Sequence, residues 1–146
     1  LLDDLLSNTR DEGEPTVKVR TELQETMMEN VSVFRNEDTL SHALNDIEGL
    51  RARAENVVVE DKGKRFNTDL MDAVEAGFMV DYAEAIAACA RHRTESRGAH
   101  SREDYEDRDD DSWLRHTLFR SDCNGTYEFD EKDVVITRFE PKERKY

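Results

Sequence analysis

The 146-residue chain has few of the residues that build metal sites or nucleotide-binding loops. Its two cysteines, Cys89 and Cys123, stand outside any Cys-x-x-Cys pair, so their spacing provides no framework for a zinc or iron–sulfur site. Two reduced thiols are favoured over a disulfide. The six glycines are scattered and form neither a dinucleotide-binding fingerprint nor a phosphate-binding loop. We therefore expect no catalytic, cofactor-binding or metal-binding residue in this chain.

Basic residues and long apolar runs are also scarce. The chain has 21 Lys and Arg against 35 Asp and Glu, a formal net charge of -14. Because phosphate contacts need clustered Lys and Arg, this balance argues against nucleic-acid binding. No apolar run approaches the roughly 20 residues of a membrane span, so no direct membrane span is expected. Many acids with few Lys would suit a halophilic protein, and an ordinary acidic protein is the alternative.

The first 14 residues have the pattern of a linker from an upstream domain. The chain opens with Leu1 rather than Met, and its first six residues include four leucines, at positions 1, 2, 5 and 6. This pattern resembles the end of a helix that is entered from upstream, and residues 7–14 are polar and aperiodic. We expect the chain to be a fragment in which residues 1–14 are a linker from a preceding domain.

Three later segments have helical periodicity. In residues 15–31, apolar residues recur every four positions; residues 36–54 follow Asn36, a plausible N-cap; and residues 67–93 follow Asn67 or Thr68. The third segment has apolar residues on more than one face, which predicts that it packs against several neighbours. We predict a mainly α fold with a three-helix antiparallel bundle, spectrin-repeat-like, over residues 15–96. Leu44 and Phe78 are the predicted core positions.

Residues 97–146 are predicted to be an irregular tail with short β strands that packs on the bundle and on an upstream domain. Its acid-rich part, residues 101–112, is expected to be a solvated loop or a docking arm, and residues 107–111 within it a solvated or Arg-paired acidic loop. Cys123-Asn124-Gly125 predicts a hairpin turn between two extended segments. Val134-Val135-Ile136 predicts a third short extended run.

The polar residues at the end of the third helix are the candidate site. Residues 91–102 contain four Arg among two His and one Glu, within an acidic chain. Such cations suit a helix C-terminus, and Gly98 could supply the left-handed residue that ends the helix. Arg is also favoured for bidentate contacts at interfaces. We predict a domain-docking element that is exposed in this chain and paired across a domain boundary, comprising Arg93, Glu95, Ser96, Arg97, His100 and Arg102.

Cys89 and His92 lie three residues apart on the same predicted helix and could touch. A Cys–His nucleophile would need an orienting acid and an oxyanion hole, and the sequence indicates neither. A buried thiol beside a helix-end histidine is the favoured interpretation.

Four stretches in order carry a resemblance to a known family. They are Val31-Ser32-Val33-Phe34-Arg35, residues 61–70 (Asp-Lys-Gly-Lys-Arg-Phe-Asn-Thr-Asp-Leu), residues 94–118 with Glu-Ser-Arg-Gly-Ala-His, and the terminal Pro-Lys-Glu-Arg-Lys-Tyr. Together they resemble the C-terminal domain of succinate dehydrogenase and fumarate reductase flavoproteins. The resemblance covers nearly everything after residue 16.

The resemblance implies a three-helix bundle and a tail that packs on the flavin-binding domain. In such subunits succinate passes a hydride to covalently bound FAD, and electrons continue through an iron–sulfur subunit to quinone. FAD would belong to the complete subunit and not to this fragment, which would be structural. Location would be cytoplasmic, at the inner face of the membrane through partner subunits.

Other hypotheses remain open at this point. Succinate dehydrogenase is preferred to fumarate reductase because of the Arg-Phe-Asn-Thr-Asp-Leu run and the Glu-Arg-Lys-Tyr end. A free-standing acidic helical adaptor and a small Cys/His enzyme are the alternatives from other classes.

Overall fold

The computed structural model describes residues 2–9 and 13–142. The predicted helix start at Leu1, part of the loop at residues 10–12 and the terminal residues 143–146 lie outside the described residues. Helices make up about half of the chain and short strands accompany them, in keeping with the predicted helical body and strand-containing tail. The first element is the short helix α1 (Leu2–Ser7).

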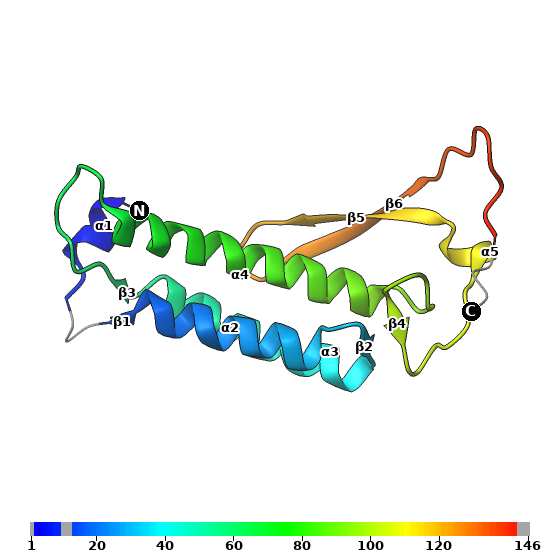
Figure 1. The fold of residues 1–146 in the computed structure, drawn as a ribbon, viewed down its shortest axis with the longest axis horizontal. Coiled ribbons are helices and arrows are strands. Elements are labelled where there is room, and N and C mark those ends of the chain that lie inside the picture. The colour runs from blue at the N-terminus through cyan, green and yellow to red at the C-terminus, as the bar shows by residue number, and fades with distance from the viewer. Residues whose placement is uncertain (1, 10–12, 143–146) are drawn as a thin grey trace.

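Three long helices make up the body of the molecule: α2 (Thr16–Asn30), α3 (Glu37–Ala54) and α4 (Thr68–His92). In Figure 1 they lie side by side, and the colours show α3 running back against the direction of α2 and α4. Their bounds agree within two residues with the helices predicted from periodicity. The body is therefore elongated, with one end at α1 and the other at the end of α4.

Asparagine caps fix the starts of α3 and α4. The Asn36 side chain accepts a hydrogen bond from the amide of Thr39 at 3.0 Å, and the Thr39 hydroxyl accepts one from the Asn36 amide at 3.1 Å. Asn67 accepts from the amide of Leu70 at 2.7 Å. Each cap satisfies an amide that has no partner within the helix, which explains why both helices begin where they do.

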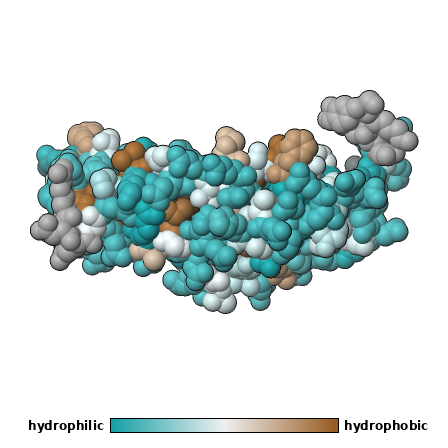
Figure 2. All heavy atoms as spheres, turned by 90° about the horizontal axis from the view of Figure 1, so that it is seen from below, coloured by the Kyte–Doolittle hydropathy of each residue, from teal (hydrophilic) through white to brown (hydrophobic). Residues whose placement is uncertain are grey.

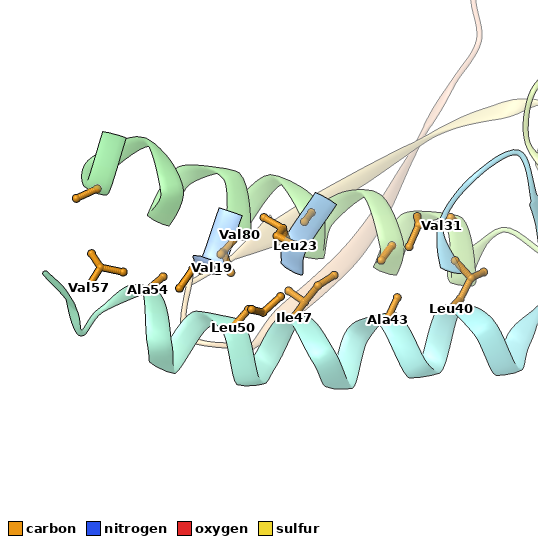
Figure 3. Close-up of a cluster of buried hydrophobic side chains, with 14 of the residues drawn as sticks. Val19, Leu23, Val31, Leu40, Ala43, Ile47, Leu50, Ala54, Val57 and Val80 are labelled. Carbon is orange, nitrogen blue, oxygen red and sulfur yellow. The ribbon is translucent and has the colours of Figure 1, made fainter. Parts of the chain in front are cut away.

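The core lies where the three helices meet (Figure 3). Val19 and Leu23 of α2 face Leu50 and Ile47 of α3, and all four are buried. Leu5 of α1 is also buried in this cluster, and half-buried Leu44 packs against it. The stretch predicted as a linker thus contributes one side chain to the core.

The prediction that Phe78 is a core residue is wrong, because 56% of its surface is exposed. Tyr82 and Ile86, on the same side of α4, are exposed as well. The buried face of α4 is built from small residues at helical spacing: Ala73, Ala76, Val80, Ala83, Ala87 and Ala90. Alanines let α4 approach α2 and α3 closely, while Phe78, Tyr82 and Ile86 point outward.

Two pairs of very short strands join distant segments. β1 (Glu14–Pro15) pairs in parallel with β3 (Val57–Val58), and β2 (Phe34–Arg35) pairs in parallel with β4 (Ser101–Arg102). The second pair holds the segment after α4 against the connection between α2 and α3.

The tail forms a hairpin of β5 (Arg115–Ser121) and β6 (Tyr127–Asp133), which lies over α4 in Figure 1. The predicted turn at Cys123-Asn124-Gly125 is confirmed, with Gly125 at φ +85°. The run at residues 134–136 forms no strand, because the pairing with β5 ends at Asp133. The acid-rich loop also contains the one-turn helix α5 (Asp110–Trp113).

Candidate docking site at the end of α4

The candidate docking residues lie together just beyond α4, on a segment that turns back on itself. α4 ends at His92, and Gly98 does not end it. Gly98 instead has φ +63° within a tight turn in which Arg97 and His100 exchange backbone hydrogen bonds of 2.8 and 3.1 Å. A left-handed residue is needed at this turn, and glycine provides it without strain.

Glu95 is the centre of the first ion-pair cluster. Its side chain has no exposed surface, and both of its oxygens are used. Arg97 donates to them from Nε and Nη2 at 2.9 Å each, Arg93 donates from Nη2, and the amide of Asp109 donates at 3.1 Å. Burial alone would raise the pKa of Glu95, but these hydrogen bonds outweigh it and lower the pKa. Glu95 is therefore an ionised, fully paired carboxylate.

Arg93 connects this cluster to the hairpin. Its Nη1 donates to the carbonyl of Arg115 at 2.9 Å and to the Thr117 hydroxyl at 3.1 Å. Its Nη2 donates to the carbonyl of Trp113 at 2.6 Å, and its guanidinium lies 5.1 Å from the centre of the Trp113 ring. One side chain thus fixes the start of β5 relative to the end of α4.

Arg102 is the centre of the second cluster and is 1% exposed. Its Nη1 donates to the carbonyls of Ala90, Arg91 and Arg93 at 3.1, 2.8 and 3.3 Å. Carbonyls in the last turn of a helix lack partners within it and carry the negative end of the helix dipole. Arg102 therefore satisfies the end of α4 with a charged donor.

The other face of Arg102 binds carboxylates. Its Nε and Nη2 donate to the two oxygens of Asp104 at 2.7 Å each, a bidentate pair. Asp104 also accepts from the amide of Glu37 at 2.9 Å, at the start of α3. The Arg102 guanidinium lowers the pKa of Asp104 to about 2. The end of α4 and the start of α3 are thereby tied by one Arg–Asp pair.

Ser96 and His100 complete the segment. The Ser96 hydroxyl accepts from the amide of Arg102 at 2.8 Å and donates to the carbonyl of Tyr105 at 2.7 Å. His100 Nε2 donates to the carbonyl of Arg93 at 3.2 Å. Burial, helped by the neighbouring Arg35 and Arg102, lowers the pKa of His100, so this histidine is neutral near pH 7.

The six predicted residues are brought together, but the expected exposure of their charges is wrong. Glu95 and Arg102 are buried, and their partners come from this chain. Sequence reasoning missed Asp104, Asp110 and Glu37 as partners; Asp110 accepts from Arg97 Nη2 at 2.7 Å. Three pairs, Arg93–Glu95, Arg97–Glu95 and Arg102–Asp104, are only two residues apart. Opposite charges two residues apart were the feature of the sequence that could have indicated these partners.

Cys89 and His92 do not form a reactive pair. Burial raises the pKa of the Cys89 thiol, which disfavours the nucleophilic thiolate. The His92 ring stacks on Phe129 at 4.0 Å between ring centres and meets Trp113 edge-on at 5.3 Å. This histidine is packed as an aromatic residue under the hairpin.

Among the described residues, the starts of α3 and α4 do not fit the pyrophosphate of FAD. Dinucleotide folds place the pyrophosphate at a helix N-terminus behind a glycine-rich turn. Here α3 and α4 begin after Asn36 and Asn67 and not after a glycine-rich turn. The amide of Glu37 already donates its hydrogen bond to the Asp104 carboxylate. Over residues 2–9 and 13–142, no cluster of three or more His, Cys, Asp or Glu could hold a metal ion.

The sequence model of the family described as "Fumarate reductase flavoprotein C-term" matches residues 20–146. The chain belongs to this family. It is 37% identical over 129 residues to the fumarate reductase flavoprotein subunit of Haemophilus influenzae, covering 88% of this chain and 22% of that protein. It is 38% identical over 120 residues to the succinate dehydrogenase flavoprotein subunit of Rickettsia conorii, covering 82% and 20%.

The fold of this C-terminal domain is also similar to a solved structure. The E. coli quinol fumarate reductase FrdA with an E245Q mutation matches with a TM-score of 0.87 and 35% identity, over 97% of this chain and 24% of that chain. The chain therefore spans about a fifth to a quarter of the length of these relatives. Within the described part of the chain, every helix is too short or too polar to cross a bilayer.

Proposed function

We propose that this domain serves a complete succinate dehydrogenase, in which an upstream part of the same subunit binds FAD and oxidises succinate to fumarate. Electrons would pass through an iron–sulfur subunit to quinone. The observation that carries the proposal is the family match over residues 20–146, together with relatives of both activities. The same membership favours a flavoprotein domain over a free-standing acidic adaptor.

Within the complete subunit we assign three parts to this chain: a linker at residues 1–14, an antiparallel, spectrin-repeat-like bundle at residues 15–96, and a tail at residues 97–146. The tail's strands would pack on the bundle and on the flavin-binding part. Attachment to the inner, cytoplasmic face of the membrane would come through partner subunits.

The role of the ion-pair clusters in this proposal is to shape a docking surface. Because Arg93, Glu95, Arg97 and Arg102 satisfy one another and their neighbours internally, they hold residues 96–105 in a fixed conformation. The exposed positions of that segment, including Ala99 and half-exposed Tyr105, would then meet the flavin-binding part. Pre-organisation of this kind lowers the entropy lost on association.

The first experiment tests the activity. The complete subunit, expressed from the gene that contains this segment, should carry flavin absorbance and reduce a dye with succinate. Fumarate reductase is the second candidate, since a fumarate reductase subunit is among the relatives. Succinate oxidation and fumarate reduction are therefore measured on one preparation; a complete protein without flavin would refute the proposal.

The second experiment tests the docking role without breaking the clusters. Ala99→Glu places a charge on the exposed face of the segment and leaves every ion pair in place. We expect lower flavin retention in the complete subunit. Arg120→Ala, on the exposed face of β5, is the matched control and should retain flavin fully. Equal flavin content in both variants would contradict docking through this segment.

A further inference from the structure

The loop at residues 60–67, which we call the Phe66 loop, lies at the opposite end of the molecule from the docking site. Figure 1 shows it next to α1, at the start of the 25-residue helix α4, whose length is roughly 37 Å at 1.5 Å per residue. Phe66 has a fully exposed side chain and a left-handed backbone, φ +51°. A bulky residue in that region is an outlier and persists only where its surroundings fix it.

Side chains at the two ends of the Phe66 loop fix its backbone. Asp69 accepts from the amides of Glu60 and Asp61, the latter at 3.3 Å. Asp61 accepts from the amide of Gly63 at 2.7 Å, and Asn67 donates to the carbonyl of Gly63 at 2.8 Å. The ring is therefore presented outward by a rigid support and not by a freely moving loop.

The charge of the loop is opposite to that of the chain. Within residues 60–67 the three basic residues Lys62, Lys64 and Arg65 outnumber the two acids that open the loop, Glu60 and Asp61, in a chain of net charge -14. Lys62 donates to the carbonyl of Asn8 at 2.8 Å, and Lys64 lies 3.2 Å from Asp3, a highly exposed pair. Arg65 is exposed. The loop thus combines one apolar ring with a cationic rim.

We propose that Phe66 is an anchor that enters an apolar pocket rimmed by carboxylates on the flavin-binding part of the same subunit. The proposal rests on the proposed function for the existence of that part. Aromatic residues and Arg are enriched in protein–protein interfaces, and Phe66 with Arg65 supplies both. The contacts to Asp3 and Asn8 place the loop beside α1, the element through which the upstream part would connect. A pocket on that part would have a high effective concentration relative to the Phe66 ring, because both belong to the same subunit.

Two features disfavour an anionic lipid surface as the occupant. Acidic residues surround the loop over the rest of the chain, and their repulsion opposes approach to negative headgroups. Membrane-surface elements also insert the apolar face of an amphipathic helix, whereas here a single ring stands on a rigid turn.

The test uses the complete subunit with p-benzoylphenylalanine substituted at Phe66, which keeps an aromatic ring at the position. Illumination should cross-link it to the flavin-binding part, and the peptide identified by mass spectrometry should contain Asp or Glu. Arg65→Glu in the same protein should reduce the cross-link yield severalfold. The probe placed instead at Met28, an exposed apolar residue on α2, is the control and should give little cross-linking.

Other outcomes overturn the proposal. A cross-link to a separate chain, binding to phosphatidylserine vesicles in place of the cross-link, or no cross-link above the Met28 control would each refute it. Flavin content and succinate-dependent dye reduction are measured on the same sample. If these are present without the cross-link, the anchor is refuted and the proposed function stands; if the flavin itself is absent, the proposed function fails.

Discussion

Arg102 has its guanidinium enclosed, and each of its three nitrogens has a partner. A buried charge costs several kcal/mol in lost hydration unless hydrogen bonds compensate it. Here the compensation comes from three backbone carbonyls at the end of α4 and just beyond it, and from both oxygens of Asp104. We therefore expect Arg102→Ala to lower the free energy of unfolding of this chain by about 3–5 kcal/mol, measured by urea denaturation.

Arg91→Ala is the matched control. Arg91 pairs with Glu37 at 2.6 Å, but both side chains are nearly half exposed. Exposed pairs contribute about 0–1 kcal/mol. Equal losses for the two variants would mean that Arg102 does not hold the end of α4.

Acid should destabilise the chain through its paired carboxylates. Arg53 lowers the pKa of Glu14 from 4.5 to about 2, and Arg102 lowers that of Asp104 from 3.8 to about 2. Since each native pKa lies below its unfolded value, the unfolded state binds more protons as pH falls. These carboxylates contribute their full stabilisation above about pH 4.5, and that stabilisation is lost as the pH falls to about 2.

Thermal midpoints measured from pH 7 to 2 should therefore decline below pH 4.5. Glu14→Gln should make that decline smaller, because one titrating group is removed, while lowering the midpoint at neutral pH. A wild-type midpoint that is unchanged down to pH 2 would show that these pairs do not stabilise the fold.

The sequence indicated the cluster of charged residues at the end of α4 but not which of them pair. Residues two apart do not face each other on a helix, so a helical interpretation of residues 91–102 gives no contact between Arg93 and Glu95. The contact exists because the backbone leaves the helix at His92 and turns at Gly98. The sequence gives even less indication that Glu37 pairs with Arg102, because Glu37 belongs to another helix.

At the scale of elements, burial follows the face of a helix and not the size of its side chains. Ile47 of α3 is 1% exposed in the core, whereas Phe78 of α4 is more than half exposed. Ile47→Ala should cost about 2–5 kcal/mol of unfolding free energy, and Phe78→Ala less than about 1 kcal/mol. Urea denaturation of both variants tests this; a larger loss at Phe78 would indicate that the outer face of α4 is packed.

Periodicity and caps were sufficient to locate α2, α3 and α4 because these signals are local. The mixed apolar faces of α4 were not sufficient to find its core face, since the choice between the alanine side and the Phe78 side depends on which neighbours are present. The pairing of β1 with β3 could not be predicted from local sequence either, because it joins residues 43 positions apart, Glu14 and Val57.

For the molecule as a whole, the acid excess predicts salt-dependent stability. Glu25 and Glu29 of α2 lie with Asp46 of α3 along one groove, where acids outnumber the single Arg53. Figure 2 shows polar residues covering most of one face. Self-repulsion is screened over about 10 Å at 0.1 M salt. The thermal midpoint should rise between low salt and molar KCl.

The control for this prediction is the Glu25→Gln/Glu29→Gln double variant, which should show a smaller rise. A flat or falling midpoint in the unmodified chain would mean that screening of its ion pairs equals or outweighs the relief of repulsion. A flat or falling curve would also remove the basis for a halophilic character, which stays a prediction from composition.

The tie between the end of α4 and the start of α3 bears on how the chain is made on the ribosome. Both helices leave the ribosome before Arg102 and Asp104, since synthesis proceeds from the N-terminus. Until residue 104 has emerged, the nascent bundle lacks the side chains that close these two ends. A stop codon between residues 93 and 102 would spare all three long helices in sequence and still yield a product that is prone to unfold.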